Sequence, residues 1–156
     1  LQGDTMLQKK VVESVRRREF LDKPNSNAKN PELMIRFLYL VDSMGNYEQS
    51  LRSARIYGKF SNDAKESLIE VLRACVRIAF FIGSDWERWE QDIRLPMAGT
   101  TLSVLVGRVS HAFLWSETDD ILNALLRIAQ FCRITLEQNG HGEELKKMIS
   151  AEAEAQ

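Results

Sequence analysis

The chain has 156 residues, of which 44% are hydrophobic and 28% are charged, and its formal net charge is −1. This length suits one domain with a sizeable buried core, and the composition is ordinary for a globular protein. The near-neutral charge gives the molecule as a whole no electrostatic attraction to nucleic acid or to an anionic membrane.

The apolar stretches and the two cysteines indicate where the protein resides. No signal-peptide pattern is visible, and the stretch 71–82 carries Arg73 and Arg77 and is shorter than the roughly 20 residues that span a bilayer. Cys75 and Cys132 lie within apolar helical patterns, so we expect reduced core thiols, with a bridge between them as the alternative. We therefore expect a cytoplasmic protein in a reducing compartment, with no membrane contact.

A first helix is predicted from Thr5 to about Leu21, because Thr5 and Gln8 have the spacing of a capping box. Residues 22–31 are a polar loop with prolines at positions 24 and 31, and we expect this loop to be mobile. Residues 1–4 are expected to fray. The apolar side of this predicted helix holds Met6, Leu7, Val11, Val12 and Val15.

Two helices are predicted next, over 32–44 and 46–57. Gly45 ends the first of them, Asn46 caps the second, and Gly58 follows its last residue. Asparagine and glycine favour these terminal positions because they accept backbone conformations that a helix interior excludes.

The segment 61–82 is the most informative, because it is a predicted helix that is apolar on almost every side. Its charged residues after the first turn follow i, i+4, i+7, i+11, which is one narrow stripe on a helix. A helix that is apolar nearly all round must be wrapped by neighbouring elements. We therefore predict a buried central helix, capped by Ser61 and ended by Gly83. The stripe consists of Glu66, Glu70, Arg73 and Arg77.

A second largely buried helix is predicted over 117–138, where the polar stripe is again narrow. Ser116 caps this helix, and Asn139 followed by Gly140 stops it. A short tail helix is expected around 145–149, followed by fraying through residues 150–156.

Between the two central helices, two further helices are predicted. Ser84 and Glu87 have capping-box spacing and begin a short helix that stops before Pro96. The segment 102–115 is helical in period, although its valines lower the helix propensity.

No strand-like alternation bounded by turns occurs in the sequence. We therefore predict an all-α protein in which residues 1–156 form a single compact bundle of seven or eight helices. Its two largely buried central helices are 61–82 and 117–138.

The sequence shows no constellation typical of an enzyme or a metal site. His111 and His141 lie in different segments, and neither belongs to a ligand or nucleophile motif. The run from Asp119 and Asp120 to Asn123 superficially matches an acidic motif for Mg²⁺-diphosphate chemistry, but that chemistry needs a second acidic motif across a deep cavity. Acidic residues in a first helical turn also complement the helix dipole. We predict no enzyme activity, no cofactor and no metal.

Five apolar residues form the leading candidate for a binding surface. Trp86, Trp89 and Ile93 follow i, i+3, i+7, and they either cover the end of the central helix or anchor a partner. Met34 and Tyr39 lie off the main apolar face of their helix and suit an oligomer contact. The leading hypothesis is therefore a non-catalytic protein that binds a protein partner, or itself, through an apolar surface that contains tryptophan.

The alternative hypothesis is a nucleic-acid-associated subunit of a ribonucleoprotein-type assembly. Two basic rows, one near the N-terminus and one on the predicted helix 46–57, would follow a phosphate backbone if they shared a face. The candidate residues are Lys9, Lys10, Arg16, Arg17, Arg18, Arg52, Arg55 and Lys59.

The nucleic-acid hypothesis predicts that the triple variant Arg16→Ala, Arg17→Ala, Arg18→Ala loses affinity for nucleic acid, because three phosphate contacts and their released counterions disappear. Fluorescence anisotropy with labelled RNA and duplex DNA at two salt concentrations measures this loss and the reduced salt dependence. Unchanged binding by the triple variant would rule out the basic face.

Overall fold

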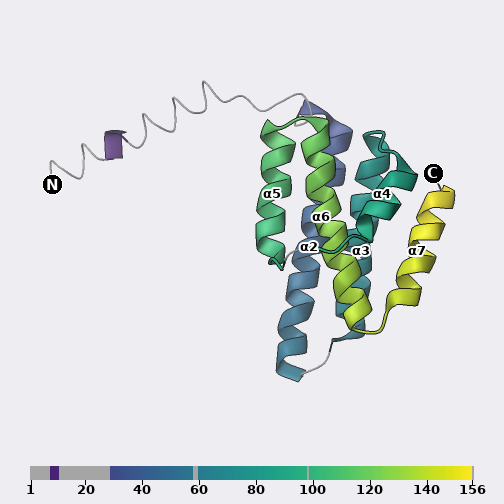
Figure 1. Ribbon diagram of the computed structural model, residues 1–156. Helices are drawn as coiled ribbons and strands as arrows, with labels where there is room; N and C mark the ends of the chain where they lie inside the picture. The colour runs from purple at the N-terminus through teal and green to yellow at the C-terminus, as the bar shows by residue number, and fades with distance from the viewer. Residues whose placement is uncertain (1–7, 11–28, 58–59, 98, 156) are drawn as a thin grey trace.

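The computed structural model describes residues 8–10, 29–57, 60–97 and 99–155, with the side chains at 53–57, 86 and 153 outside that description (Figure 1). Every regular element in these ranges is helical, and no strand occurs in them, so the predicted all-α class is confirmed. The helices are α2 (Pro31–Tyr57), α3 (Asn62–Phe81), α4 (Trp86–Ile93), α5 (Leu102–Trp115), α6 (Thr118–Gln138) and α7 (Gly142–Ala155).

The predicted first helix and the loop after it lie almost wholly outside the described residues, as do residues 1–4 and Gly58. Of the first helix, only residues 8–10 are described, and they are helical. Across the described part of the chain, no helix has the length and hydropathy needed to cross a membrane.

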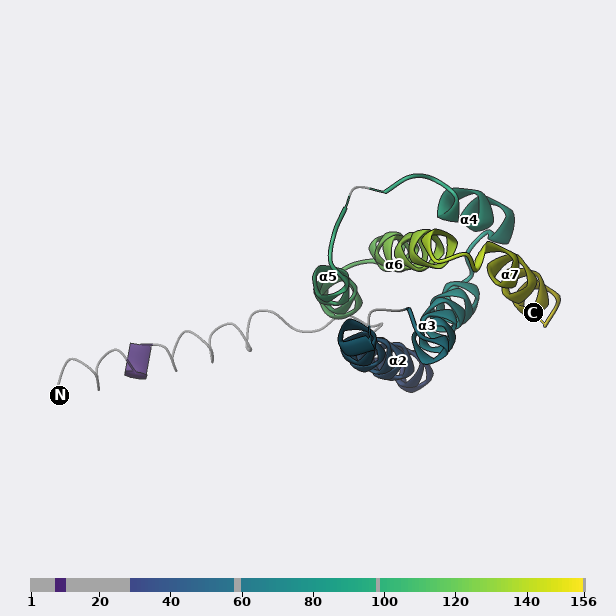
Figure 2. The same cartoon turned by 90° about the horizontal axis from the view of Figure 1, so that it is seen from below.

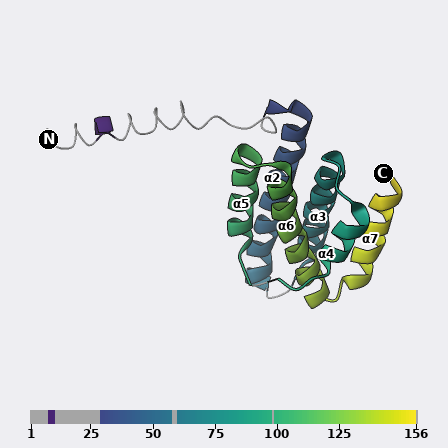
Figure 3. The same ribbon diagram turned by 45° about the horizontal axis from the view of Figure 1, so that its top comes forward.

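The two predicted central helices, α3 and α6, pack against each other at the centre of the bundle. Figure 2 shows α2 and α5 on one side of this pair and α4 and α7 on the other. α2 runs beside α3, α5 and α4 pack on α6, and α7 contacts both central helices (Figure 3). Wrapping on both sides explains why α3 and α6 are apolar around most of their circumference.

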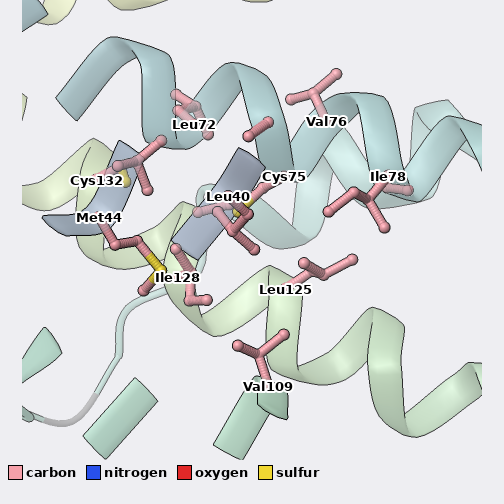
Figure 4. Close-up of a cluster of buried hydrophobic side chains, with 14 of the residues drawn as sticks. Leu40, Met44, Leu72, Cys75, Val76, Ile78, Val109, Leu125, Ile128 and Cys132 are labelled. Carbon is pink, nitrogen blue, oxygen red and sulfur yellow. The ribbon is translucent and has the colours of Figure 1, made fainter. Parts of the chain in front are cut away.

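Buried core residues come from each of the helices α2 to α7, and Figure 4 shows a cluster of them from α2, α3, α5 and α6. Cys75 and Cys132 are free and fully buried there. Burial raises the pKa of both thiols, so they stay protonated and pack as small hydrophobic groups. Around them lie Leu40 and Met44 of α2, Leu72 of α3, Val109 of α5, and Leu125 and Ile128 of α6.

Both central helices end as predicted, in glycines with positive φ. After α3, Gly83 has φ +85°, and the amides of Gly83 and Ser84 donate to the carbonyls of Phe80 and Ala79. α6 ends in the same way at Gly140, which has φ +82°. Left-handed residues of this kind close a helix because their hydrogen bonds satisfy its last carbonyl groups.

The N-termini of α4 and α6 differ from the prediction. Ser61 caps α3 as expected, its hydroxyl oxygen accepting from the amide of Ala64 at 3.1 Å. The backbone amide of Ser84, however, donates to a carbonyl at the C-terminal end of α3. The carboxylate of Asp85 caps α4 instead. Ser116 ends α5, and Glu117 begins α6 without a side-chain cap.

The predicted break at Gly45 is wrong, because α2 continues through it as one helix. Leu40, Met44 and Tyr47 form a continuous buried row on both sides of the glycine. Packing of this row against the core outweighs the roughly 1 kcal/mol by which glycine disfavours a helix interior.

The predicted fraying after residue 150 is also wrong, since α7 stays helical to Ala155. Glu152 is buried, and its carboxylate lies 2.9 Å from the guanidinium of Arg73 and 3.4 Å from that of Arg77. α7 therefore supplies the partner for the charged stripe of α3. Burying the carboxylate of Glu152 without cationic partners would be costly, and Arg73 and Arg77 supply them.

We expect Gly45→Ala to stabilise the protein by about 0.5–1 kcal/mol, because the position is helical and a Cβ atom there would meet nothing within 4 Å. Urea unfolding followed by circular dichroism measures this change. The matched variant Gly83→Ala should instead destabilise by about 1–2 kcal/mol, because it forces alanine into positive φ. Loss of stability in Gly45→Ala would contradict this account.

Candidate functional site

The predicted surface on α4 is not exposed at two of its three residues. Trp89 and Ile93 are 5% and 1% exposed, and the side chain of Trp86 lies outside the described residues. α4 is held on α6 by the side chains of Gln130 and Arg133, which donate to the carbonyls of Asp92 and Ile93 at 2.9 and 2.8 Å. The sequence analysis left two interpretations open for these residues, covering the end of the central helix or anchoring a partner. The burial of Trp89 and Ile93 fits the first.

The first half of α2 carries four of the eight large hydrophobic residues that are exposed in the described part of the chain. Eight of the nine residues from 33 to 41 are apolar, with Arg36 as the exception. The bundle fully buries Leu33 and Leu40, and the ring of Phe37 stacks on that of Phe113 with centroids 4.5 Å apart. The remaining apolar side chains of this stretch are left at the surface or only half covered.

We call this surface the α2 face: Met34, Ile35, Leu38, Tyr39 and Val41. Ile35 is 67% exposed, Leu38 56% and Tyr39 47%. Val41 is the least exposed of the exposed residues in this set, and Met34 is half-buried against the core. Met34 and Tyr39 thus share a surface with three residues that the sequence analysis did not select: Ile35, Leu38 and Val41.

Charged groups border the α2 face where it meets α3. The Tyr39 hydroxyl donates to the Glu70 carboxylate at 3.1 Å, and this bond, with the negative charge of Glu70, raises the pKa of Tyr39. The Arg36 guanidinium lies 4.8 Å from the ring centroid of Phe81 and pairs with Glu32 at 3.3 Å. These contacts orient Tyr39 and Arg36 along the edge and leave the centre of the face apolar.

A glycine extends the apolar row of α2. Met34, Leu38, Val41 and Gly45 follow i, i+4, i+7, i+11, so they form one line along the helix. Gly45 is exposed, and nothing lies within 4 Å of the position its Cβ would take. The line therefore ends at bare backbone, which another chain can approach closely.

Most of the predicted basic face lies outside the described residues. Lys9, Lys10 and Arg52 are exposed, whereas Arg16, Arg17 and Arg18, and the side chains of Arg55 and Lys59, lie outside the described residues. The basic face remains a prediction.

The histidines lie in unrelated places. His111 is exposed on α5, and His141 lies beside Phe60 and 3.6 Å from the Glu144 carboxylate. In the part of the chain that the structure describes, no three side chains of metal-binding type are grouped to hold an ion.

Comparison of the chain with models of protein families, with curated proteins and with solved structures gave no match. Functional inference therefore depends on the surfaces of this molecule alone.

We expect Trp89→Ala to destabilise the protein by about 3–5 kcal/mol, because it removes a large buried side chain between α4 and α6. Chemical denaturation measures the loss. Trp115→Ala is the matched control: its side chain is 42% exposed, and its removal should cost much less. Similar stability of the two variants would refute a core role for Trp89.

Proposed function

We propose that this protein is a non-catalytic interaction module that binds another polypeptide chain through the α2 face. The observation that carries the proposal is the exposure of Ile35, Leu38 and Tyr39 side by side on the first half of α2, where eight of the nine residues from 33 to 41 are apolar. Such a helix requires covering on more sides than this bundle provides. Contiguous exposed apolar patches of this kind mark interaction sites.

The apolar character is confined to one half of α2, which argues for a specific surface. Between Val41 and Arg52, where the side chains are described, the exposed residues are polar or glycine: Asp42, Gly45, Asn46, Glu48, Gln49 and Arg52. The same helix thus changes from an apolar to a solvated exterior within about three turns. Ordinary solvation accounts for the described exterior from residue 42 to residue 52, and a bound partner would account for the apolar first half.

The mechanism that suits this surface is packing of helix against helix. Full burial of one large aliphatic side chain contributes about 1.5–3 kcal/mol, so Ile35 and Leu38 are the expected anchors. Glu32, Arg36 and Asp42 surround them and would set the orientation of the partner. Gly45 allows a partner helix to come close where the row ends.

The partner is either a second copy of this chain or a different protein. Free, buried Cys75 and Cys132 support a reducing, intracellular setting for either. We infer no chemical step, because the sequence motifs provide neither a nucleophile with its base nor a phosphate-binding loop.

We expect the double variant Ile35→Glu, Leu38→Glu to keep its fold, with a stability change of about 0.5 kcal/mol or less, because both side chains are exposed. Its binding should fall by at least about a hundredfold, because two buried carboxylates replace two apolar anchors. Sedimentation velocity measures self-association. A photo-crosslinking residue at position 38 measures binding to other proteins in an extract of the source cells.

Gln49→Glu is the control for these measurements, since it adds a charge on the exposed polar half of the same helix. A crosslinker at position 49 should give no defined adduct. Unchanged association by the double variant, or equal crosslinking from positions 38 and 49, would overturn the proposal.

A further inference from the structure

A cleft of about 340 Å³ lies between α4 and the first half of α6. It is separate from the α2 face, because α2 and α4 lie on opposite sides of the central pair α3 and α6 (Figure 2). No step of the proposed function uses it.

Each wall of the cleft carries two polar side chains at helical spacing. On the α4 wall, Asp85 and Asp92 are seven residues apart, which places them on one face two turns apart. On the α6 wall, Asp119 and Asn123 are four residues apart, one turn along the helix. The sequence analysis noted Asp119 and Asn123 as part of a superficial acidic motif, and the structure places Asp85 and Asp92 of the α4 wall across the cleft from them.

The lining between the polar rows is apolar. Trp89 lies between Asp85 and Asp92 in sequence and is almost fully buried. Leu122 and Leu126 continue the α6 wall and are half-buried. The cleft therefore combines an apolar surface with carboxylates, an arrangement that suits a cationic head group on an aliphatic stem.

Several polar groups of the cleft have unused hydrogen-bonding capacity. Asp119 and Asn123 make no side-chain hydrogen bond or ion pair within the described residues. The Ser84 hydroxyl also lines the cleft, and it is buried with no hydrogen-bond partner in the described structure. Carboxylate, amide and hydroxyl oxygens are all acceptors, so a ligand rich in N–H donors would satisfy them together.

The charge balance of the cleft favours a cation. Three carboxylates face one guanidinium, that of Arg88, whose side chain is 83% exposed and 3.9 Å from the carboxylate of Asp92. The positive end of α4 is already compensated, because the Asp85 carboxylate accepts from the amides of Glu87 and Arg88. Among the described residues no three side chains of metal-binding type are grouped to hold an ion, and carboxylates spread along both walls suit an extended organic cation.

We propose that this cleft binds a guanidinium or primary ammonium group carried on an aliphatic stem. Two sources share this chemistry: an arginine or lysine side chain of a partner polypeptide, and a free small amine. The carboxylates of Asp85 and Asp119 pair with the head group, and Trp89 and Leu122 pack against the stem.

The test is an NMR titration of the ¹⁵N-labelled full chain with two probes, agmatine and the peptide acetyl-Gly-Arg-Gly-amide. The expected result is saturable shifts of the Trp89 indole N–H and of the amides around residues 85–89 and 119–123, weakening as salt is added. Saturation by both probes assigns the cleft to small amines as well as side chains, and saturation by the peptide alone assigns it to a partner chain. The neutral peptide acetyl-Gly-citrulline-Gly-amide should not bind.

Charge-removing variants make the test specific to the cleft. Asp119→Asn and Asp85→Asn should each raise the dissociation constant by about tenfold, and asparagine at position 85 keeps the helix cap. Asp120→Asn is the matched control, because it removes the same charge from the same turn of α6 without lining the cleft. Absence of saturable shifts with both probes, or equal weakening by Asp120→Asn, would overturn the assignment.

Discussion

The contact between α3 and α6 is the constraint on which the rest of this structure depends. Both helices bury most of their circumference, so neither can face water on any broad side. A helix pair of this kind must be enclosed, and the other helices of the described chain are arranged to enclose it: α2 and α5 on one side, α4 and α7 on the other (Figure 2). Hydrophobic burial thus determines the architecture, and the connections between helices follow from it.

Ion pairs with α3 hold the last helix, α7, in place. The stripe of α3 includes the partly exposed Arg73 and Arg77, and the buried carboxylate of Glu152 requires cationic partners of this kind nearby. α7 provides Glu152 to both arginines, and at its other end Glu144 pairs with Lys65 at 3.0 Å. That pair lowers the pKa of Glu144 and raises the pKa of Lys65. α7 therefore lies along α3 with ion pairs at both ends, and it contributes apolar side chains between them.

The same layered arrangement produces the two surfaces for which we propose functions. α2 is covered by the bundle on its inner side alone, so its apolar first half faces outward at Ile35 and Leu38. α4 has only eight residues, and it meets α6 beside a cleft bordered by Asp85 and Asp119. α2 and α4 lie on opposite sides of α3 and α6, and the residues that line the cleft include none of the α2 face.

The sequence by itself determined the helical class, the two central helices and the glycine stops at Gly83 and Gly140, because periodicity and left-handed glycines are local properties of a chain. Only the tertiary structure decided the continuity of α2 through Gly45, the helical end of α7 and the burial of Trp89. Each of these depends on contacts between residues far apart in sequence, such as Arg73 with Glu152. The α2 face was partly visible in the apolar run 33–41. Its exposure was not, because periodicity shows which side chains need covering and only packing shows which are left uncovered.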